Sequence, residues 1–191
     1  MKTFSSAFAA GRERPGAVVA LGKFDGLHRG HRRLLRAAAR SARALAAACL
    51  VVTFDPSPEA FFGLGPGRPL TSRAELPALL GRLGVDGVVF LPFGRALACQ
   101  APRAFARDVL ARALRAAEVW VGEDFCFGRD RAGRVEHLAD FGREYGYRTR
   151  AVPLLRDGKE KISSSRIRVL LARGDTARAE RLLGRRLPRS G

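Results

Sequence analysis

The chain has 191 residues, of which 47% are hydrophobic, so it can form an ordered core and is not an intrinsically disordered protein. Its formal net charge of +17 comes from 35 basic residues against 18 acidic ones, which favours anionic substrates. The basic residues are spread along nearly the whole sequence rather than gathered in one block, and this argues against specific nucleic-acid binding.

The sequence shows no pattern typical of a membrane span or a signal peptide. The apolar stretch 44–54 is too short to span a bilayer, and the first residues lack the long apolar core of a signal peptide. The three cysteines, Cys49, Cys99 and Cys126, are far apart and form no C-x-x-C pair. We therefore expect a cytoplasmic protein with reduced thiols and no membrane partner.

Apolar runs rich in β-branched residues alternate with helical patterns along the chain, as in βα units around a parallel sheet. Strands are predicted at 17–21, 50–54, 87–91, 119–122 and 148–153. Helices are predicted at 31–48, 73–83, 102–115 and 136–145, followed by a helical tail over 166–183 that breaks near Gly174. The expected fold is α/β, with a parallel sheet of about five strands flanked by helices, in a single domain 1–191 whose core covers about 15–184.

A glycine- and histidine-rich motif follows the first predicted strand directly. Residues 22–31 read G-K-F-D-G-L-H-R-G-H, and the next helix begins near Gly30. The glycines allow a tight turn and a close approach to a ligand, while the helix start offers free amides and the positive end of its dipole. Two of the three histidines, His28 and His31, lie here, and no further Cys or His has metal-ligand spacing. The motif predicts a polyphosphate site.

Two other segments bear on phosphate binding. The glycine-rich stretch 63–67 is interpreted as a flexible loop, because no helix follows it and the chain has no Walker-type motif. At the start of the tail, residues 162–168 read I-S-S-S-R-I-R. Like the first site, this segment offers free amides at a helix start, here combined with hydroxyls and a cation one turn further along. A plain serine cap is one interpretation. The other is that Lys161, the serines and Arg168 hold a second phosphate, so that one triphosphate spans both sites.

Four motifs occur in order: G-K-F-D-G-L-H-R-G-H, T-F-D-P-S-P-E, V-G-E-D-F-C-F-G and I-S-S-S-R-I-R. Together they resemble the FMN adenylyltransferase domain of bacterial bifunctional riboflavin kinase/FAD synthetases, over about residues 18–184. The resemblance implies a Rossmann-like nucleotidyltransferase fold. It also implies transfer of AMP from MgATP to FMN with release of pyrophosphate.

The resemblance further implies three sets of site residues. The catalytic set is His28, His31, Ser164 and Arg168. Further ATP contacts are implied for Gly22, Phe24, Asp25, Gly30, Lys161, Ser163 and Ser165. A flavin pocket is implied for Pro56, Pro58, Phe62, Asp124 and Phe127. Mg²⁺ is expected mainly through the ATP phosphates, and no protein ligand is assigned to it.

The sequence departs from the family pattern at three positions. Ser57 replaces a usual histidine between two prolines, Lys23 replaces a usual Asn or Thr, and Asp124 replaces an amide near a phosphorylated substrate. Phe125 and Phe127 alternate around Cys126, so one or both enter the core while the other face of the pair is open to an aromatic ligand. The same ambiguity holds for Phe61 and Phe62.

Where the family continues into a β-barrel riboflavin kinase domain, this sequence stops, so no kinase activity is expected and a separate riboflavin kinase would supply FMN. Two alternatives stay open. One is a nucleotidyltransferase of the same superfamily with another phosphorylated acceptor, such as phosphopantetheine or nicotinamide mononucleotide. The other is a non-catalytic module that binds flavin nucleotides or RNA.

Overall fold

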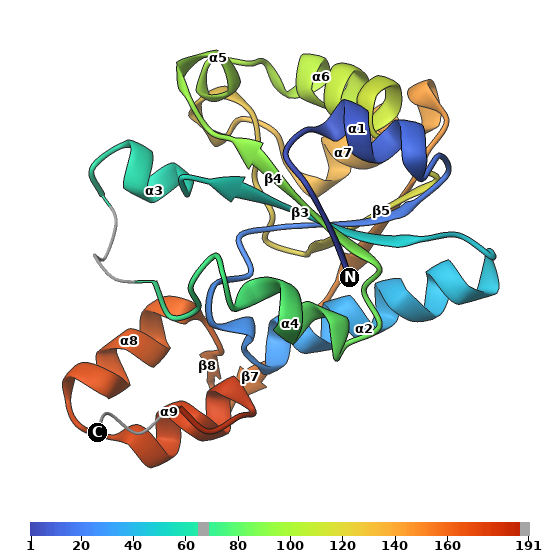
Figure 1. Cartoon of the computed structure of the whole chain (residues 1–191). Coiled ribbons are helices and arrows are strands. Elements are labelled where there is room, and N and C mark those ends of the chain that lie inside the picture. The colour runs from blue at the N-terminus through green and yellow to red at the C-terminus, as the bar shows by residue number, and fades with distance from the viewer. Residues whose placement is uncertain (65–68, 188–191) are drawn as a thin grey trace.

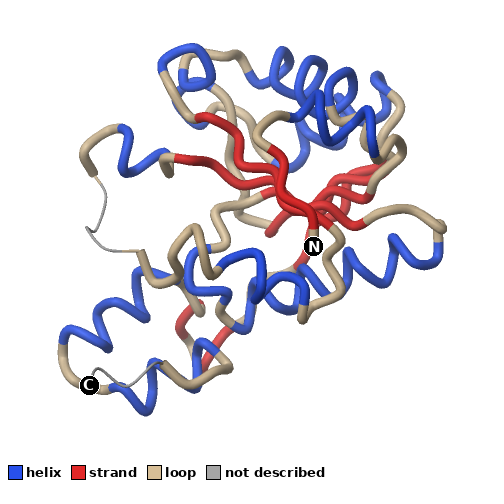
Figure 2. The backbone as a smooth tube through the Cα atoms, viewed as in Figure 1, coloured by secondary structure: helices blue, strands red, loops and turns tan. Residues whose placement is uncertain are grey.

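A parallel β-sheet runs through the middle of the molecule (Figures 1 and 2). The computed structural model describes residues 1–64 and 69–187, and in these the sheet has six strands in the order β1-β4-β3-β2-β5-β6. The strands are β1 Lys2–Phe4, β2 Val18–Leu21, β3 Cys49–Asp55, β4 Gly87–Pro92, β5 Glu118–Gly122 and β6 Arg148–Val152. Strand β2 therefore lies between β3 and β5, where the strand order reverses.

Strand β2 shows how the sequence produces this sheet. All four of its residues are buried, as is typical of a central parallel strand with helices on both faces. Successive side chains point to opposite faces. Val18 and Ala20 belong to one hydrophobic cluster, whereas Val19 and Leu21 belong to the cluster on the other face.

Helices cover both faces of the sheet (Figure 1). The upper face in that view carries α1 Ala7–Glu13, α6 Pro102–Phe105, the π-helix η2 Ala106–Ala113 and α7 Val135–Tyr145. The lower face carries α2 Arg29–Ala44 and α4 Leu76–Gly81. Two short helices, α3 Pro58–Phe61 and α5 Arg95–Ala98, follow the ends of β3 and β4, and η1 Asp25–Leu27 and η3 Arg129–Arg131 are single turns. No described helix combines the length and apolarity needed to cross a membrane.

The C-terminal tail forms its own small unit. A two-stranded antiparallel pair, β7 Arg156–Asp157 and β8 Glu160–Lys161, leads into α8 Ser164–Ala172 and α9 Thr176–Leu183. Gly174 has φ +76°, and the Asp175 side chain accepts a 3.1 Å hydrogen bond from the Arg178 amide, so one helix ends and the next is capped here. The two helices share a separate hydrophobic cluster that includes Ile167, Leu170 and Leu182.

The structure confirms the α/β fold and all five predicted strands to within two residues. The main sheet of the described residues has six strands rather than about five, because the sequence does not predict β1. The sequence also does not predict the pair β7 and β8. Predicted helix 73–83 is shorter, at Leu76–Gly81, and predicted helix 102–115 is α-helical only over its first turn and π-helical thereafter. The predicted loop 63–67 lies largely outside the described residues.

Candidate functional site

The turn between β2 and α2 lies at the carboxyl end of the central strand, which is the position where parallel α/β sheets bind ligands. The chain leaves Leu21, and the Gly22 amide donates to Val52 O at 3.1 Å. A left-handed residue, Phe24 at φ 50°, and Gly26 at φ +80° then fold it back into η1. A side chain at Gly26 would be strained and would meet Leu70 and Leu183 at 3.0 and 3.2 Å, so this turn requires glycine.

The two histidines of the motif stack on each other at the start of α2. His28 is the N-cap, and its Nδ1 accepts a 3.2 Å hydrogen bond from the His31 amide. The ring centroids are 3.6 Å apart with an interplanar angle of 16°. A Cβ at Gly30 would lie 3.1 Å from the His28 ring, so a side chain here would press the ring out of its present position. Phe24 is buried and packs edge-on against His31 with centroids 5.3 Å apart, and it therefore supports the pair from within the core.

Both imidazoles are uncharged at neutral pH. Burial, followed by the charge of Lys161, lowers the pKa of His28 to about 4. Burial also lowers the pKa of His31 well below its ordinary value, and His28 and Lys23 lower it further. Because His28 Nδ1 accepts a hydrogen bond, the neutral ring carries its proton on Nε2. His28 thus has an N–H donor available, and His31 Nδ1 is buried without a partner among the described residues.

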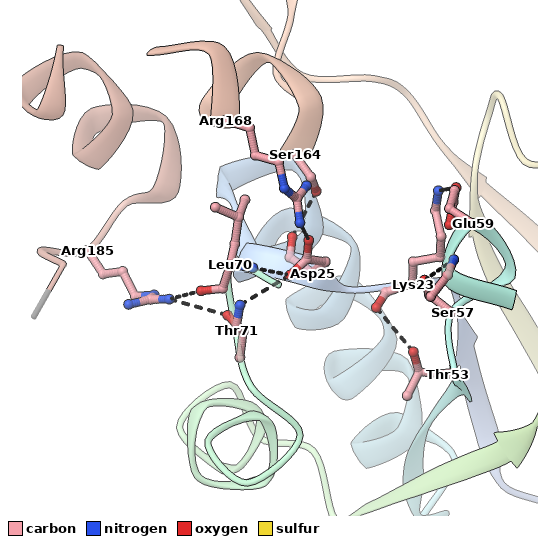
Figure 3. Close-up of polar contacts among 11 residues, drawn as sticks. Lys23, Asp25, Thr53, Ser57, Glu59, Leu70, Thr71, Ser164, Arg168 and Arg185 are labelled. Atoms are coloured by element: carbon pink, nitrogen blue, oxygen red, sulfur yellow. Dashed lines mark hydrogen bonds and ion pairs between the residues drawn. The ribbon is translucent and has the colours of Figure 1, made fainter. Parts of the chain in front are cut away.

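Asp25 joins this turn to the tail and to a third segment (Figure 3). One carboxylate oxygen accepts hydrogen bonds from the amides of Leu70 at 2.8 Å and Thr71 at 3.1 Å. The other oxygen forms an ion pair with Arg168, and the Asp25 carbonyl accepts a 2.8 Å hydrogen bond from Ser164 Oγ. The starts of α2 and α8, which are more than a hundred residues apart in sequence, are therefore held side by side.

The three serines of the second motif have different environments. Ser163 is the N-cap of α8, and its Oγ accepts a 3.2 Å hydrogen bond from the Arg166 amide. Ser164 contacts Asp25 as described, and Ser165 is exposed. The cap interpretation therefore describes Ser163, whereas Ser164 and Arg168 face the histidine turn (Figure 3). Arg168 Nε is buried without a hydrogen-bond partner in the described part of the chain.

Two lysines complete the positive charge around the histidines. Lys161, at the end of β8, forms an ion pair with Asp124, which follows β5. Lys23 forms an ion pair with Glu59 of α3. Each lysine thus links a segment predicted to bind phosphate to a segment predicted to contribute to the flavin pocket. These ion pairs are partly exposed, so an anionic ligand can compete for both ammonium groups.

The predicted flavin residues lie in three different settings. Pro56 lines an open cavity of about 610 Å³ at the ends of β3 and β4, together with Phe93, Leu97 and other residues that the sequence did not single out. Phe62 is exposed and packs against Phe93 with ring centroids 6.1 Å apart, and Pro58 begins α3. Phe93 directly follows β4, and no sequence motif marks it.

Asp124 and Phe127 come from the loop after β5. Phe127 is buried in the core against Phe105, at a centroid distance of 5.8 Å, while Phe125 stacks on it and is partly exposed. Of the aromatic pair, Phe127 therefore takes the core position and Phe125 presents the accessible face. Neither Asp124 nor Phe127 lines the cavity beside Pro56. Ser57 caps α3, accepting a 3.2 Å hydrogen bond from the Ala60 amide.

The described residues contain no group of three or more His, Cys, Asp or Glu side chains that could hold an ion. Asp25, the acidic residue nearest the histidines in sequence, already has both oxygens engaged. The donor set therefore fits a divalent cation carried on phosphate oxygens better than one held by the protein alone.

Comparison with known proteins gives a consistent result. The sequence model of the FAD synthetase family matches residues 11–166. The bifunctional riboflavin kinase/FMN adenylyltransferase of Escherichia coli (strain K12) is 36% identical over 178 residues, covering 92% of this chain and 56% of that protein. The FAD synthetase of Listeria monocytogenes serovar 1/2a is 31% identical over 183 residues, covering 92% of this chain and 72% of that protein. The chain thus spans about half the length of the Escherichia coli relative.

The alignment with a further relative covers most of both chains. The putative bifunctional riboflavin kinase/FMN adenylyltransferase of Geobacillus thermodenitrificans (strain NG80-2) is 38% identical over 170 residues, which is 89% of this chain and 90% of that protein. Among solved structures, a Streptococcus pneumoniae protein named macrolide-efflux protein superimposes with a TM-score of 0.81 at 29% identity, covering 97% of this chain and 70% of that one. Pantothenate synthetase from Thermus thermophilus, with a TM-score of 0.53 at 18% identity, covers 96% of this chain and 81% of its own, and shares the fold.

Proposed function

The chain belongs to the FAD synthetase family, and from this premise we propose that it transfers AMP from MgATP to FMN, giving FAD and pyrophosphate. The observation that carries the proposal is the junction at Asp25, where the His28–His31 turn and the Ser164–Arg168 helix start meet. The N-termini of α2 and α8 thus lie close to one junction, which suits a ligand with several linked phosphates.

The reaction needs positioning more than proton transfer. The phosphate of FMN is already ionised near neutral pH, so no general base has to activate it. One of its oxygens attacks the α-phosphorus of ATP, the bond from that phosphorus to the bridging oxygen of the β-phosphate breaks, and pyrophosphate leaves with the electron pair. The protein has to align two anions that repel each other and neutralise the charge that builds up.

The proposed roles follow from the groups that each side chain offers. His28 would donate its Nε2–H to an oxygen of the α-phosphate, because its Nδ1 is engaged by the His31 amide. Arg168 and Ser164 would hold the β- and γ-phosphates, with Lys161 and Lys23 adding positive charge once their carboxylate partners are displaced. Mg²⁺ bound to the triphosphate would supply further charge neutralisation.

The flavin pocket is proposed on the flank of the histidine turn where α3 follows β3. Pro56 and Phe93 line the open cavity beside α3, and Phe62 presents accessible aromatic surface against Phe93. Phe125, on the loop after β5, is partly exposed as well. An isoalloxazine ring is large, planar and mostly apolar, so stacking on such side chains suits it. The ion pairs Lys23–Glu59 and Lys161–Asp124 tie this flank to the phosphate site.

The deciding experiment offers acceptors one at a time. The purified protein is incubated with MgATP and FMN, riboflavin, phosphopantetheine or nicotinamide mononucleotide, and dinucleotide and pyrophosphate are followed by chromatography. FAD and pyrophosphate in equal amounts, formed from FMN but not from riboflavin, are expected. Product from another acceptor only would replace FMN in the proposal. No product from any acceptor, together with tight flavin or RNA binding, would favour a non-catalytic module.

A further inference from the structure

A second basic site begins at Arg29, the first residue of α2, and runs along a groove between α2 and the end of α9. The groove has a volume of about 540 Å³. Its lining consists of six arginines and two uncharged residues: Arg29, Arg32, Arg33, Arg36, Arg40, Arg181, Leu155 and Gly184. We call it the arginine groove. None of these residues belongs to the sets assigned above to ATP or FMN, and the proposed reaction gives the groove no role.

The groove is built by two elements that are distant in sequence. Its five α2 arginines recur three or four residues apart, so they share one helix face over about 16 Å of axis. The end of α9 lies against this face, because Arg32 donates a 3.4 Å hydrogen bond to Gly184 O. A Cβ at Gly184 would lie 3.2 Å from Arg29 Cγ, so glycine permits this close approach. Arg181 then lines the side of the groove that α9 provides.

The positive charge of the arginine groove is not neutralised within the described residues. None of its six arginines forms an ion pair with a described carboxylate, whereas arginines elsewhere do so, as in Arg103–Glu144 and Arg143–Asp140. Burial, and then the charges of Arg36 and Arg185, lower the pKa of Arg32. Like charges three and four residues apart on a helix repel each other. A bound anion would relieve this repulsion.

The chemistry of the lining restricts which anion fits. A guanidinium group can donate two parallel hydrogen bonds to a phosphate, so successive arginines suit successive phosphates. The lining offers no aromatic ring for stacking a base, and no side-chain amide or hydroxyl for contacting a base or a sugar. One isolated phosphate would reach only neighbouring arginines. We propose that the arginine groove binds a linear chain of condensed phosphates, at a site separate from that of ATP.

The test compares two variants that each lose three positive charges. The groove variant combines Arg33→Gln, Arg36→Gln and Arg40→Gln. The control combines Arg12→Gln, Arg82→Gln and Arg173→Gln, which are exposed and have no described ion pair. Gln is a good helix former, so α2 should fold in the groove variant. Binding of inorganic polyphosphate of defined chain length is measured by calorimetry at several salt concentrations, with and without saturating MgATP.

The groove variant should bind polyphosphate at least about tenfold more weakly than wild type, and its slope of log K against log salt should be smaller by about 2 to 3. The control should stay close to wild type, and MgATP should leave binding in place. Polyphosphate should also raise the melting temperature of wild type more than that of the groove variant. Adenylyl transfer should be unchanged in the groove variant.

Three results would overturn the proposal. Equal weakening in both variants would show that net charge alone attracts the polyanion. Loss of polyphosphate binding on adding MgATP would place it in the nucleotide site. A nucleic-acid duplex or an acidic peptide that binds as tightly, with the same sensitivity to the groove substitutions, would show that the ligand is not a bare phosphate chain.

Discussion

The stacked histidines illustrate, at the scale of single residues, how a ligand can change the charge of its own site. Without a ligand, burial and the nearby lysines keep both imidazoles neutral. A triphosphate placed beside them would reverse the local potential and raise both pKa values. His28 would then donate a stronger hydrogen bond to a substrate oxygen when negative charge increases there.

We predict that His28→Ala lowers kcat by on the order of 10²- to 10³-fold, comparable to the loss of one oxyanion donor, because no other described side chain takes the same position at the helix start. Steady-state kinetics of FAD formation checks this. His137→Ala, which alters an exposed histidine on α7, is the matched control and should behave as wild type. Wild-type turnover in His28→Ala would remove this imidazole from the mechanism.

The histidine pair also predicts a pH dependence of stability. In the unfolded chain a histidine has a pKa near 6.5, whereas folding lowers the pKa of His28 to about 4. Below pH 6.5 the unfolded chain therefore binds a proton that the folded protein does not. The free energy of unfolding should fall by up to about 1.4 kcal/mol per pH unit per group as the pH drops toward 4.

Urea unfolding at pH 7, 5.5 and 4.5 measures this loss, and His28→Gln should make it shallower. A His28→Gln profile parallel to that of wild type would show that this imidazole is protonated as easily in the folded protein as in the unfolded chain.

We predict that Asp25 acts as a positioning residue, through its contacts with Arg168 and the amides of Leu70 and Thr71. Asp25→Asn keeps an oxygen for the amides of Leu70 and Thr71 but loses the ion pair that orients Arg168. The KM for ATP should rise by about tenfold or more, with a smaller change in kcat, and Asp25→Glu should restore part of the affinity. Asp140→Asn, which breaks an exposed ion pair with Arg143, is the control. Unchanged KM values in Asp25→Asn would refute this role.

At the scale of elements, the first turn of α2 contains Gly30, a residue with low helix propensity that leaves room for the histidine stack. Replacing glycine by alanine inside a helix ordinarily stabilises it by up to about 1 kcal/mol. At Gly30 the new Cβ would press on the His28 ring at 3.1 Å. Gly30→Ala should therefore keep or raise the melting temperature while lowering kcat/KM by about tenfold.

Gly81→Ala in α4 is the matched comparison, because its Cβ would meet nothing closer than Met1 Cβ at 3.9 Å. It should leave kcat/KM unchanged. If Gly30→Ala retained full activity, the stack would not depend on the space that glycine provides. Thermal unfolding and FAD synthesis, measured on the same preparations, separate the two effects.

The sequence predicted the central elements well because burial imposes their pattern. Strand β2 and the apolar face of α2 show the expected periodicity, and each was placed to within a few residues. Strand β1 was missed because it has three residues and only Phe4 is buried. The π-helical turns of η2 also escaped prediction, since a change in helical hydrogen bonding leaves the hydrophobic pattern nearly intact.

Side-chain partners in the candidate site were harder to predict than its location. The two motifs indicated that distant segments meet, and the junction at Asp25 brings them together. The sequence could not indicate that Lys23 pairs with Glu59, or that Phe127 rather than Phe125 is buried, because these depend on tertiary packing. Phe93 was overlooked because a lone aromatic after a strand carries no motif.

At the scale of the whole molecule, the excess of positive charge should govern encounter with substrates. Both proposed substrates are anions, and the net charge of +17 attracts them over distances set by the salt concentration. Raising the salt concentration from about 20 to about 300 mM should increase the KM values for ATP and FMN several-fold, because salt screens electrostatic steering. The value of kcat should change little. Kinetics in KCl tests this. A fall in kcat at constant KM would instead place the salt effect on a later step.

The tail's separate hydrophobic cluster has a consequence for how tightly a ligand is held. Ser164 and Arg168 belong to a helical pair whose apolar contacts are largely its own, so we expect this pair to open locally more readily than the sheet unfolds. Each opening would remove half of the proposed phosphate contacts, and the measured affinity would fall in proportion to the fraction of molecules in which the pair is closed. Amide hydrogen exchange in α8 and α9 would report that fraction, and binding strength could then be tuned by residues that never approach the nucleotide.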